Sequence, residues 1–107
     1  LHNRKHSFPT RRSSDLVYIL ASRPHGAIYI GATTNLLRRV TQHRFGAVDA
    51  HTRKYRIRRL VYFETHDTLE DALAREHKLK RWRRAWKDAL IAEANPMWRD
   101  MAGEIPL

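Results

Sequence analysis

The chain has 107 residues, enough for one domain with a single modest core, and its 21 Lys and Arg against 11 Asp and Glu give a formal net charge of +10. This charge favours a polyanionic partner, nucleic acid first and an acidic membrane surface second, over an acidic small substrate. Cysteine is absent and no run of about 18 apolar residues occurs, which excludes disulfides, thiolate metal sites and a membrane-spanning helix and leads us to expect a cytoplasmic protein.

Residues 1–15 differ in composition from everything that follows. They are basic, rich in Ser, contain Pro and lack an initiator Met. We expect a disordered or non-native leader, similar to translated adapter sequence, with a transit peptide as the alternative because Arg and Ser without many acids suit one. The expected division is therefore a leader over 1–15, a domain over 16–100 and a tail over 101–107.

Two apolar runs on either side of a turn predict a β-hairpin. The first run covers 16–21, the second covers 27–30, and residues 24–26 read Pro-His-Gly. Each run contains a tyrosine, Tyr18 in the first and Tyr29 in the second. The hairpin is expected to bring the two phenols to one place.

Helical patterns alternate with one further strand in the rest of the chain. Thr33 and Thr34 offer capping hydroxyls to a helix over 35–44, which Phe45-Gly46 ends, and a polar loop follows as far as Arg58. Later, Asp67 with Glu70 three residues on is a capping pattern. The elements expected after the loop are a strand over 59–64, a helix from about 67 to 84 and a helix over 86–94 that Asn95-Pro96 ends. The predicted order is ββαβαα.

Periodicity separates the two adjacent arginines of the helix over 35–44. Its buried direction is defined by Leu36, Leu37 and Val40. Arg39 and His43 lie at one border of that stripe and can reach the hairpin, whereas Arg38 points to the opposite side, toward solvent or a phosphate. An ion pair for Arg39 and a hydrogen-bonded structural role for His43 are the alternatives to a place in an active site.

A carboxylate, Glu76, occupies an apolar position on the helix over 67–84. The core spacing there is set by Leu69, Ala72, Leu73 and Leu79. A carboxylate at such a position needs a partner, and Arg39 or a divalent cation is expected to provide it. A single Glu completed by water and phosphate oxygens is typical of Mg²⁺. Zinc is not expected, because no metal-ligand spacing joins His43, His51, His66 and His77.

Tryptophans are interleaved with basic residues near the end of the chain. Trp82, Trp86 and Trp98 are able to stack bases, but the spacing of the first two favours closure of the core at a helix junction. Seven of the thirteen residues over 75–87 are basic, which predicts a phosphate track without sequence specificity. The residues expected to bind nucleic acid are Arg38, Lys54, Lys80, Arg81 and Arg84.

Residues 16–100 resemble the GIY-YIG nuclease superfamily, in particular its small stand-alone members related to the nuclease module of the excinuclease C subunit. Leu16-Val17-Tyr18 stands at the first family tripeptide and Tyr29-Ile30-Gly31 matches the second. Arg39 matches the helix arginine of the family, and His43 matches the His or Tyr one turn later. Glu76 stands at the position of the metal-binding glutamate. Two departures are Leu16 at the first glycine and Ala32 where some relatives carry a lysine thought to help ionise a tyrosine.

The resemblance implies an α+β fold, a small antiparallel three-stranded sheet flanked by helices, and phosphodiester hydrolysis assisted by one Mg²⁺ or Mn²⁺ on Glu76. It also implies a role for Tyr18 as general base or water positioner with Tyr29 as its partner, for Arg39 as the cation that stabilises the phosphate, and for His43 as the group that orients Tyr18 or accepts the proton. Because a free phenol has a pKa near 10, Arg39 and the metal would have to promote its ionisation.

The function expected from these residues is a DNA endonuclease, directed by DNA structure or damage and with a place in DNA repair among its possible roles. A catalytically weak nucleic-acid-binding module of the same fold is the first alternative. A basic structural or RNA-binding protein is the second, and it leaves the aligned tyrosines, arginine and glutamate unexplained. The natural substrate and the oligomeric state stay open.

Overall fold

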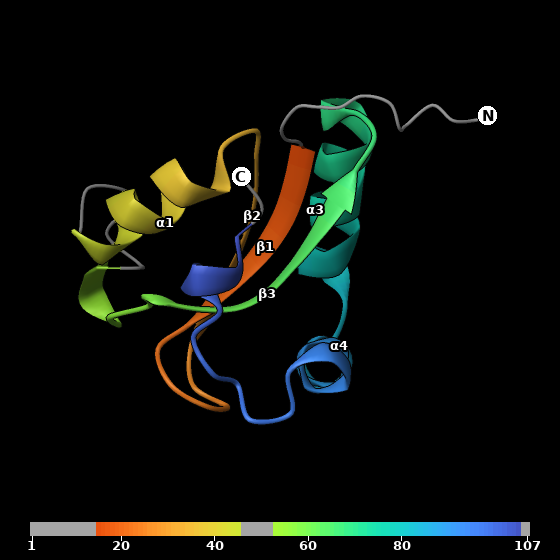
Figure 1. The fold of residues 1–107 in the computed structure, drawn as a ribbon. Helices are drawn as coiled ribbons and strands as arrows, with labels where there is room; N and C mark the ends of the chain where they lie inside the picture. Colours follow the sequence, from red (N-terminus) through yellow and green to blue (C-terminus); the bar gives the residue numbers. More distant parts are fainter. Residues whose placement is uncertain (1–14, 46–52, 106–107) are drawn as a thin grey trace.

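A three-stranded antiparallel sheet organises the computed structural model, which describes residues 15–45 and 53–105 (Figure 1). The elements in chain order are β1 (Asp15–Ala21), β2 (Ile28–Thr33), α1 (Leu36–Arg44), β3 (Arg59–His66), α3 (Leu69–Arg81), α4 (Arg84–Ala94) and a short 3₁₀ helix, η2 (Ala102–Glu104). The strand order β2-β1-β3 places β1 in the centre, antiparallel to both neighbours. The predicted α+β class and the order ββαβαα are confirmed.

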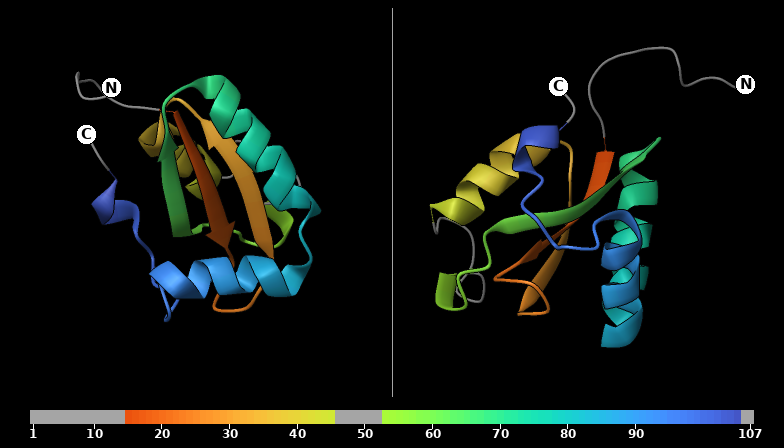
Figure 2. Two further views of the ribbon diagram at one scale, coloured as in Figure 1. Left: turned by 90° about the vertical axis from the view of Figure 1, so that its right-hand side faces the viewer. Right: turned by 60° about the horizontal axis from the view of Figure 1, so that its bottom comes forward.

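Both faces of the sheet are covered, which explains why β1 is an unbroken apolar run rather than an alternating one. Val17 and Ile19 pack in the cluster on the side of α3 and α4, and Leu16, Tyr18 and Leu20 pack on the side of α1. Figure 2 shows α3 and α4 crossing one face of the three strands, with α1 behind the other. The hairpin thereby carries Tyr18 into the layer between the sheet and α1.

The caps of α1 and α3 differ from the predicted ones by one or two residues. The side chain of Asn35, rather than that of Thr33 or Thr34, caps α1 by accepting a hydrogen bond from the Arg38 N–H at 3.1 Å. The hydroxyl of Thr68, not the carboxylate of Asp67, caps α3. In both places the residue that directly precedes the first helical turn is the one positioned to accept, as capping geometry requires.

The junction between the helices predicted over 67–84 and 86–94 lies two to three residues earlier in the structure, because α4 already begins at Arg84. α3 ends at Arg81, and Trp82 adopts an extended conformation that turns its ring toward the core. Trp82 lies edge-on to Trp86, with ring centroids 5.9 Å apart, so these two side chains do close the helix junction. Trp98 is fully buried, which excludes it as a stacking platform for bases.

The buried faces of α1 and α3 are narrower than predicted. Leu37, Leu69 and Leu73 were expected in the core, yet they are 50%, 42% and 48% exposed. The core positions of α1 are Leu36, Val40 and His43, and those of α3 are Ala72 and Leu79. Each helix meets the sheet along one line of side chains, so apolar residues one position away from that line face outward.

Asn95, the residue that follows the last turn of α4, forms three side-chain hydrogen bonds outside the helix. Its amide donates to the carbonyls of Val61 and Arg99 at 3.1 and 2.9 Å, and its oxygen accepts from the Arg99 N–H. The segment after α4 is thereby fixed against β3. Residues 101–105, predicted to be a tail, continue this contact through the Met101 N–H, which donates to the Leu60 carbonyl at 2.7 Å.

The predicted boundary at residue 15 moves by one position, because Asp15 already belongs to β1. The rest of the predicted leader, residues 1–14, and residues 46–52 of the predicted loop lie outside the described residues. Within the described part of the chain, no helix is both long and apolar enough to traverse a bilayer.

Candidate active site

Tyr18 lies flat against Gly31, its direct partner on β2. The two residues are paired in the antiparallel register, and a Cβ atom at Gly31 would stand 2.5 Å from the Tyr18 hydroxyl oxygen and 2.6 Å from Cζ. Only a glycine leaves room for the ring at this position. The Tyr-Ile-Gly tripeptide therefore serves two purposes, presenting Tyr29 and making space for Tyr18.

Replacing Gly31 with alanine is expected to destabilise the protein by about 1–3 kcal/mol, because the new methyl group overpacks a site closed by a buried ring. Alanine in place of glycine in an open strand normally has the opposite sign. The matched control is Gly103→Ala, since a Cβ there meets nothing within 4 Å. Urea denaturation measures both variants, and equal stability of Gly31→Ala and the parent protein would contradict the packing described here.

His43 completes an aromatic group with the two tyrosines. The Tyr18 hydroxyl oxygen and His43 Nε2 are 3.3 Å apart, a hydrogen bond between two buried side chains. The imidazole centroid lies 6.0 Å from that of Tyr18 and 4.9 Å from that of Tyr29, and the two phenol rings are 6.3 Å apart. A phenol and an imidazole in contact provide a route along which a proton can move.

Arg39 extends from the preceding turn of α1 toward the same two phenols. Interaction with Tyr18 is the main reason that the pKa of its guanidinium rises, with Tyr29 adding to the effect. Arg39 Nη1 also donates to Gln42 Oε1 at 3.2 Å, which orients the guanidinium. Arg38, the preceding residue on the helix, is exposed. The structure thus separates the two arginines as the periodicity predicted.

Burial dominates the ionisation of Tyr18. Its side chain is fully buried, and the loss of solvent raises the pKa of its phenol to about 12, although Arg39 acts to lower it. The negative charges of an ionised Tyr29 and of Glu76 act in the same direction as burial. Arg39 lowers the pKa of Tyr18, as expected, but burial raises it by more. Tyr18 is therefore protonated at neutral pH.

Glu76 lies within electrostatic range of this group, but its ion-pair partner is neither Arg39 nor another residue of α1. Lys80 Nζ, one turn later on α3, lies 2.7 Å from Glu76 Oε2. The Glu76 side chain is 18% exposed, so solvent can reach its carboxylate, which already pairs with the ammonium group of Lys80. No group of three or more His, Asp or Glu able to bind a metal occurs among residues 15–45 and 53–105. A single hard oxygen donor that solvent can reach fits Mg²⁺ or Mn²⁺ completed by other oxygens, and does not fit zinc.

The residues predicted to bind nucleic acid are dispersed over the surface. Arg38, Lys54 and Arg81 are exposed on three different segments. Arg84 instead serves the fold, because its guanidinium pairs with Asp88 and donates to the carbonyl of Gly26 in the hairpin turn. A continuous track over 75–87 is therefore interrupted at both ends, since Arg75 also turns inward.

Arg75 belongs to a polar network on the opposite face of the sheet that sequence reasoning missed. Its Nε donates to Glu64 at 2.9 Å, and Tyr62 and His66 reach the same carboxylate at 2.5 and 2.6 Å. Burial opposes ionisation of Glu64, but the hydrogen bonds from Tyr62, Arg75 and His66 outweigh it and lower its pKa. Alternation of polar residues along β3 was the available signal. The network ties β3 to α3.

Comparison with known proteins agrees with the geometry around Tyr18. The GIY-YIG catalytic domain matches residues 15–89, a range that includes both tyrosines, the helix arginine and Glu76. The chain belongs to the GIY-YIG family. Membership gives this domain a nuclease-type catalytic architecture and a nucleic-acid substrate, and nucleases of the family typically use divalent metals.

Relatives of this GIY-YIG domain include small UPF0213 proteins. One from Haloquadratum walsbyi is 40% identical over 67 residues, covering 63% of this chain and 75% of its own. One from Natronomonas pharaonis is 38% identical over 77 residues, covering 72% and 89%. The solution NMR structure of a UPF0213 protein from Bacillus halodurans is 32% identical, with a TM-score of 0.46 over 73% of this chain and 82% of that one.

Proposed function

We propose that this GIY-YIG domain is a metal-dependent DNA endonuclease that hydrolyses phosphodiester bonds at sites marked by DNA structure or damage. The observation that carries the proposal is the convergence of Tyr18, Tyr29, Arg39 and His43 on one side of the sheet, within the electrostatic reach of Glu76. A purely structural role leaves this gathering of proton-transfer and phosphate-binding groups unexplained.

Proton transfer in the proposed mechanism runs from water through Tyr18 to His43. Burial keeps the Tyr18 phenol protonated and closed to solvent, so the mechanism requires substrate binding to bring the attacking water to its oxygen. That oxygen then accepts the proton of the water as its own proton passes to His43 Nε2, 3.3 Å away. The water oxygen forms the new bond to phosphorus as the bond to the leaving oxygen breaks. The water proton ends on the imidazole, and the leaving oxygen departs with the electron pair and takes a proton from solvent. Tyr29, 4.9 Å from His43 between ring centroids, packs against the imidazole and holds it in place.

Charge on the phosphate is stabilised by Arg39, whose guanidinium provides a fixed fork of donors. Glu76 would hold Mg²⁺ or Mn²⁺, which supplies Lewis-acid neutralisation of the phosphate oxygens when bound. The ammonium group of Lys80 already pairs with that carboxylate. A bound metal ion would therefore compete with Lys80 for the same oxygen.

Incubation with Mg²⁺ or Mn²⁺ and a panel of branched, nicked and single-stranded DNA, with matched RNA, tests the proposal. Metal-dependent cleavage of one or more DNA substrates is the expected result. Contacts to the phosphate backbone carry no sequence information, so products are expected to follow the shape of the substrate rather than its sequence.

A binding module without useful catalysis is the second candidate, favoured by two observations. The surroundings of Tyr18 raise its pKa rather than lower it, and Lys80 forms an ion pair with the carboxylate that would bind the metal, Glu76. Both candidates predict salt-sensitive binding. Absence of cleavage across the whole panel, with binding retained, would select this candidate over the enzyme.

The dependence of kcat on pH distinguishes a relay from a phenolate base. A phenol of pKa about 12 is only about 0.001% ionised at pH 7, and a mechanism that required the phenolate would gain about tenfold per pH unit up to that value. With His43 accepting the proton, the rate of the parent enzyme is expected to rise far less steeply, because no phenolate has to form before the reaction. The His43→Gln variant, which cannot take the proton, should be slower and rise about tenfold per unit. An equal rise in both proteins would contradict the relay.

A further inference from the structure

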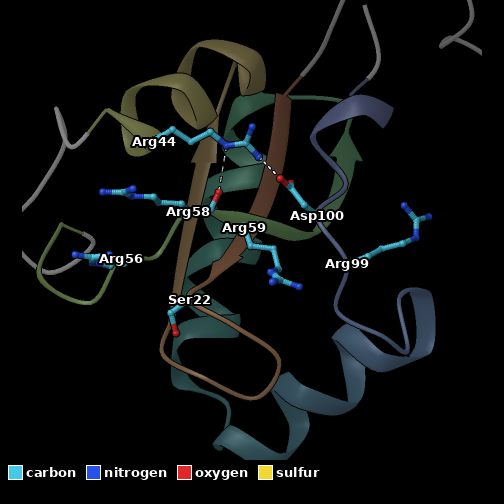
Figure 3. Close-up of a pocket in the computed structure, with 7 residues that line it drawn as sticks. All are labelled: Ser22, Arg44, Arg56, Arg58, Arg59, Arg99 and Asp100. Atoms are coloured by element: carbon cyan, nitrogen blue, oxygen red, sulfur yellow. Dashed lines mark hydrogen bonds and ion pairs between the residues drawn. The ribbon is translucent and has the colours of Figure 1, made fainter.

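An open pocket with a volume of about 570 Å³ lies at the end of the sheet where β1 finishes and β3 begins (Figure 3). Five arginines and one carboxylate line it, contributed by α1, by the segment before β3, by β3 itself and by the segment after α4. They are Arg44, Arg56, Arg58, Arg59, Arg99 and Asp100. The pocket belongs neither to the tyrosine group nor to the basic face of α3.

Two of the five guanidiniums are neutralised within the protein. Arg44 pairs with Asp100 and also donates to the Arg58 carbonyl, and Arg99 pairs with Glu104 and points away from the other arginines in Figure 3. Asp100 is further occupied by the backbone N–H groups of Leu60 and Ala102. Asp100 therefore stabilises the local fold through Arg44 and two backbone groups, and it forms no ion pair with Arg56, Arg58 or Arg59.

Three arginines keep their charge available. Among the described residues, Arg56, Arg58 and Arg59 form no ion pair, although Arg59 Nη1 donates to the Trp98 carbonyl at 3.0 Å. Arg56 and Arg58 are exposed and extend toward the same side of the close-up (Figure 3). Several positive charges that line one pocket favour an anion there.

The backbone holds these arginines in a defined arrangement. Ile57, between Arg56 and Arg58, is fully buried and anchors the segment in the core cluster beneath α1. Arg56 has φ of 55°, a left-handed conformation that favours Gly and Asn. An arginine at such a position, beside a buried anchor, motivates the hypothesis of a function for its side chain.

We propose that this pocket binds a backbone phosphate of the nucleic-acid substrate, outside the phosphodiester that is cleaved. The inference deepens the proposed function and rests on it. Arginine forks match phosphate oxygens in pairs, which a lysine does not. Arg44 and Arg39 are five residues apart on α1, roughly 7.5 Å of helix rise, while one DNA strand advances about 3.4 Å per phosphate. The pocket thus lies within a few nucleotides of the tyrosine group.

The test is the salt dependence of binding in the presence of EDTA, where cleavage cannot occur. The variant Arg56→Asn with Arg58→Gln removes two charges, and Asn suits the left-handed backbone at 56. With a fluorescein-labelled DNA duplex, the loss of one phosphate contact is expected to lower the slope of log affinity against log salt by about 0.9. The affinity advantage of the parent protein should then shrink about three- to fourfold between roughly 50 and 200 mM salt.

The matched control is Arg99→Gln, an arginine of the same pocket that Glu104 already neutralises, and its slope should stay close to that of the parent. An unchanged slope for the double variant, with its thermal unfolding unchanged, would overturn the proposal. Binding of inorganic pyrophosphate by the parent without any change in the duplex slope of the variant would overturn it too, by assigning the pocket to a small phosphate ligand. If the slope falls but the parent cleaves nothing in the metal panel, the pocket proposal stands and the nuclease proposal fails.

Discussion

Replacing Glu76 with alanine is expected to reduce metal-dependent cleavage by at least about 10³-fold. Glu76 is the carboxylate that reaches the tyrosine group, through its effect on the pKa of Tyr18, and it is accessible enough to bind a cation. Without it, the charge that develops on the phosphate loses its metal and keeps only Arg39, a loss of several kcal/mol of stabilisation. Single-turnover cleavage with excess Mg²⁺ measures the effect.

Binding in EDTA separates this effect from a loss of affinity. Glu76→Ala frees Lys80 from its ion pair, so duplex binding should be unchanged or slightly tighter. Glu93→Ala is the matched control, because Glu93 is exposed on α4 and forms no ion pair with the described residues. Cleavage by the Glu76 variant within tenfold of the parent would remove Glu76 from the site and leave the metal without its expected ligand.

Local patterns predicted the elements and the gathering of the site because these depend on short stretches of chain. The spacing of Tyr18 and Tyr29 fixes their meeting once a hairpin forms, and the step from Arg39 to His43 is one helical turn. Gly31 was visible as part of a motif. Its steric role was not, because the ring that fills its space comes from the neighbouring strand.

Features that depend on how helices meet the sheet were predicted less well. Leu73 has the spacing of a core residue but lies half exposed. The expected partner of Glu76 is Arg39 or a divalent cation, and in the structure the carboxylate pairs with Lys80 on its own helix. An i,i+4 pair satisfies a carboxylate without tertiary contact, so it competes with any distant partner. Periodicity measures which side of a helix is apolar and does not measure how far the neighbouring layer reaches.

The arginine pocket was out of reach for a different reason. The basic residues over 53–58 are visible as a run in the predicted polar loop, and Arg59 begins the predicted strand. The pocket that these residues line also needs Arg44 and Asp100. Those two are 56 residues apart in sequence and meet only when the segment after α4 packs on β3. The burial of Ile57 and the backbone of Arg56 are likewise properties of the folded chain.

Replacing Arg39 with alanine is expected to reduce kcat about 10²- to 10³-fold, whereas Arg38→Ala should change it by less than about threefold. The two residues are adjacent on α1, so each substitution removes the same charge from the same helix and has a similar effect on helix propensity. The two side chains differ in their surroundings, because that of Arg39 is partly buried and interacts with Tyr18 and Tyr29, whereas that of Arg38 is exposed.

The conservative variant Arg39→Lys shows which property of the guanidinium is used. Lysine keeps the charge and loses the fork of donors, so it should restore part of the rate if charge near the phosphate dominates and almost none if paired hydrogen bonds do. Because Arg39 also acts to lower the pKa of Tyr18, its removal raises that pKa further and deepens the loss for any mechanism that uses the phenolate. Equal losses at Arg38 and Arg39 would mean that both act only as phosphate contacts, and the relay from Tyr18 to His43 would then lack its charge-stabilising partner.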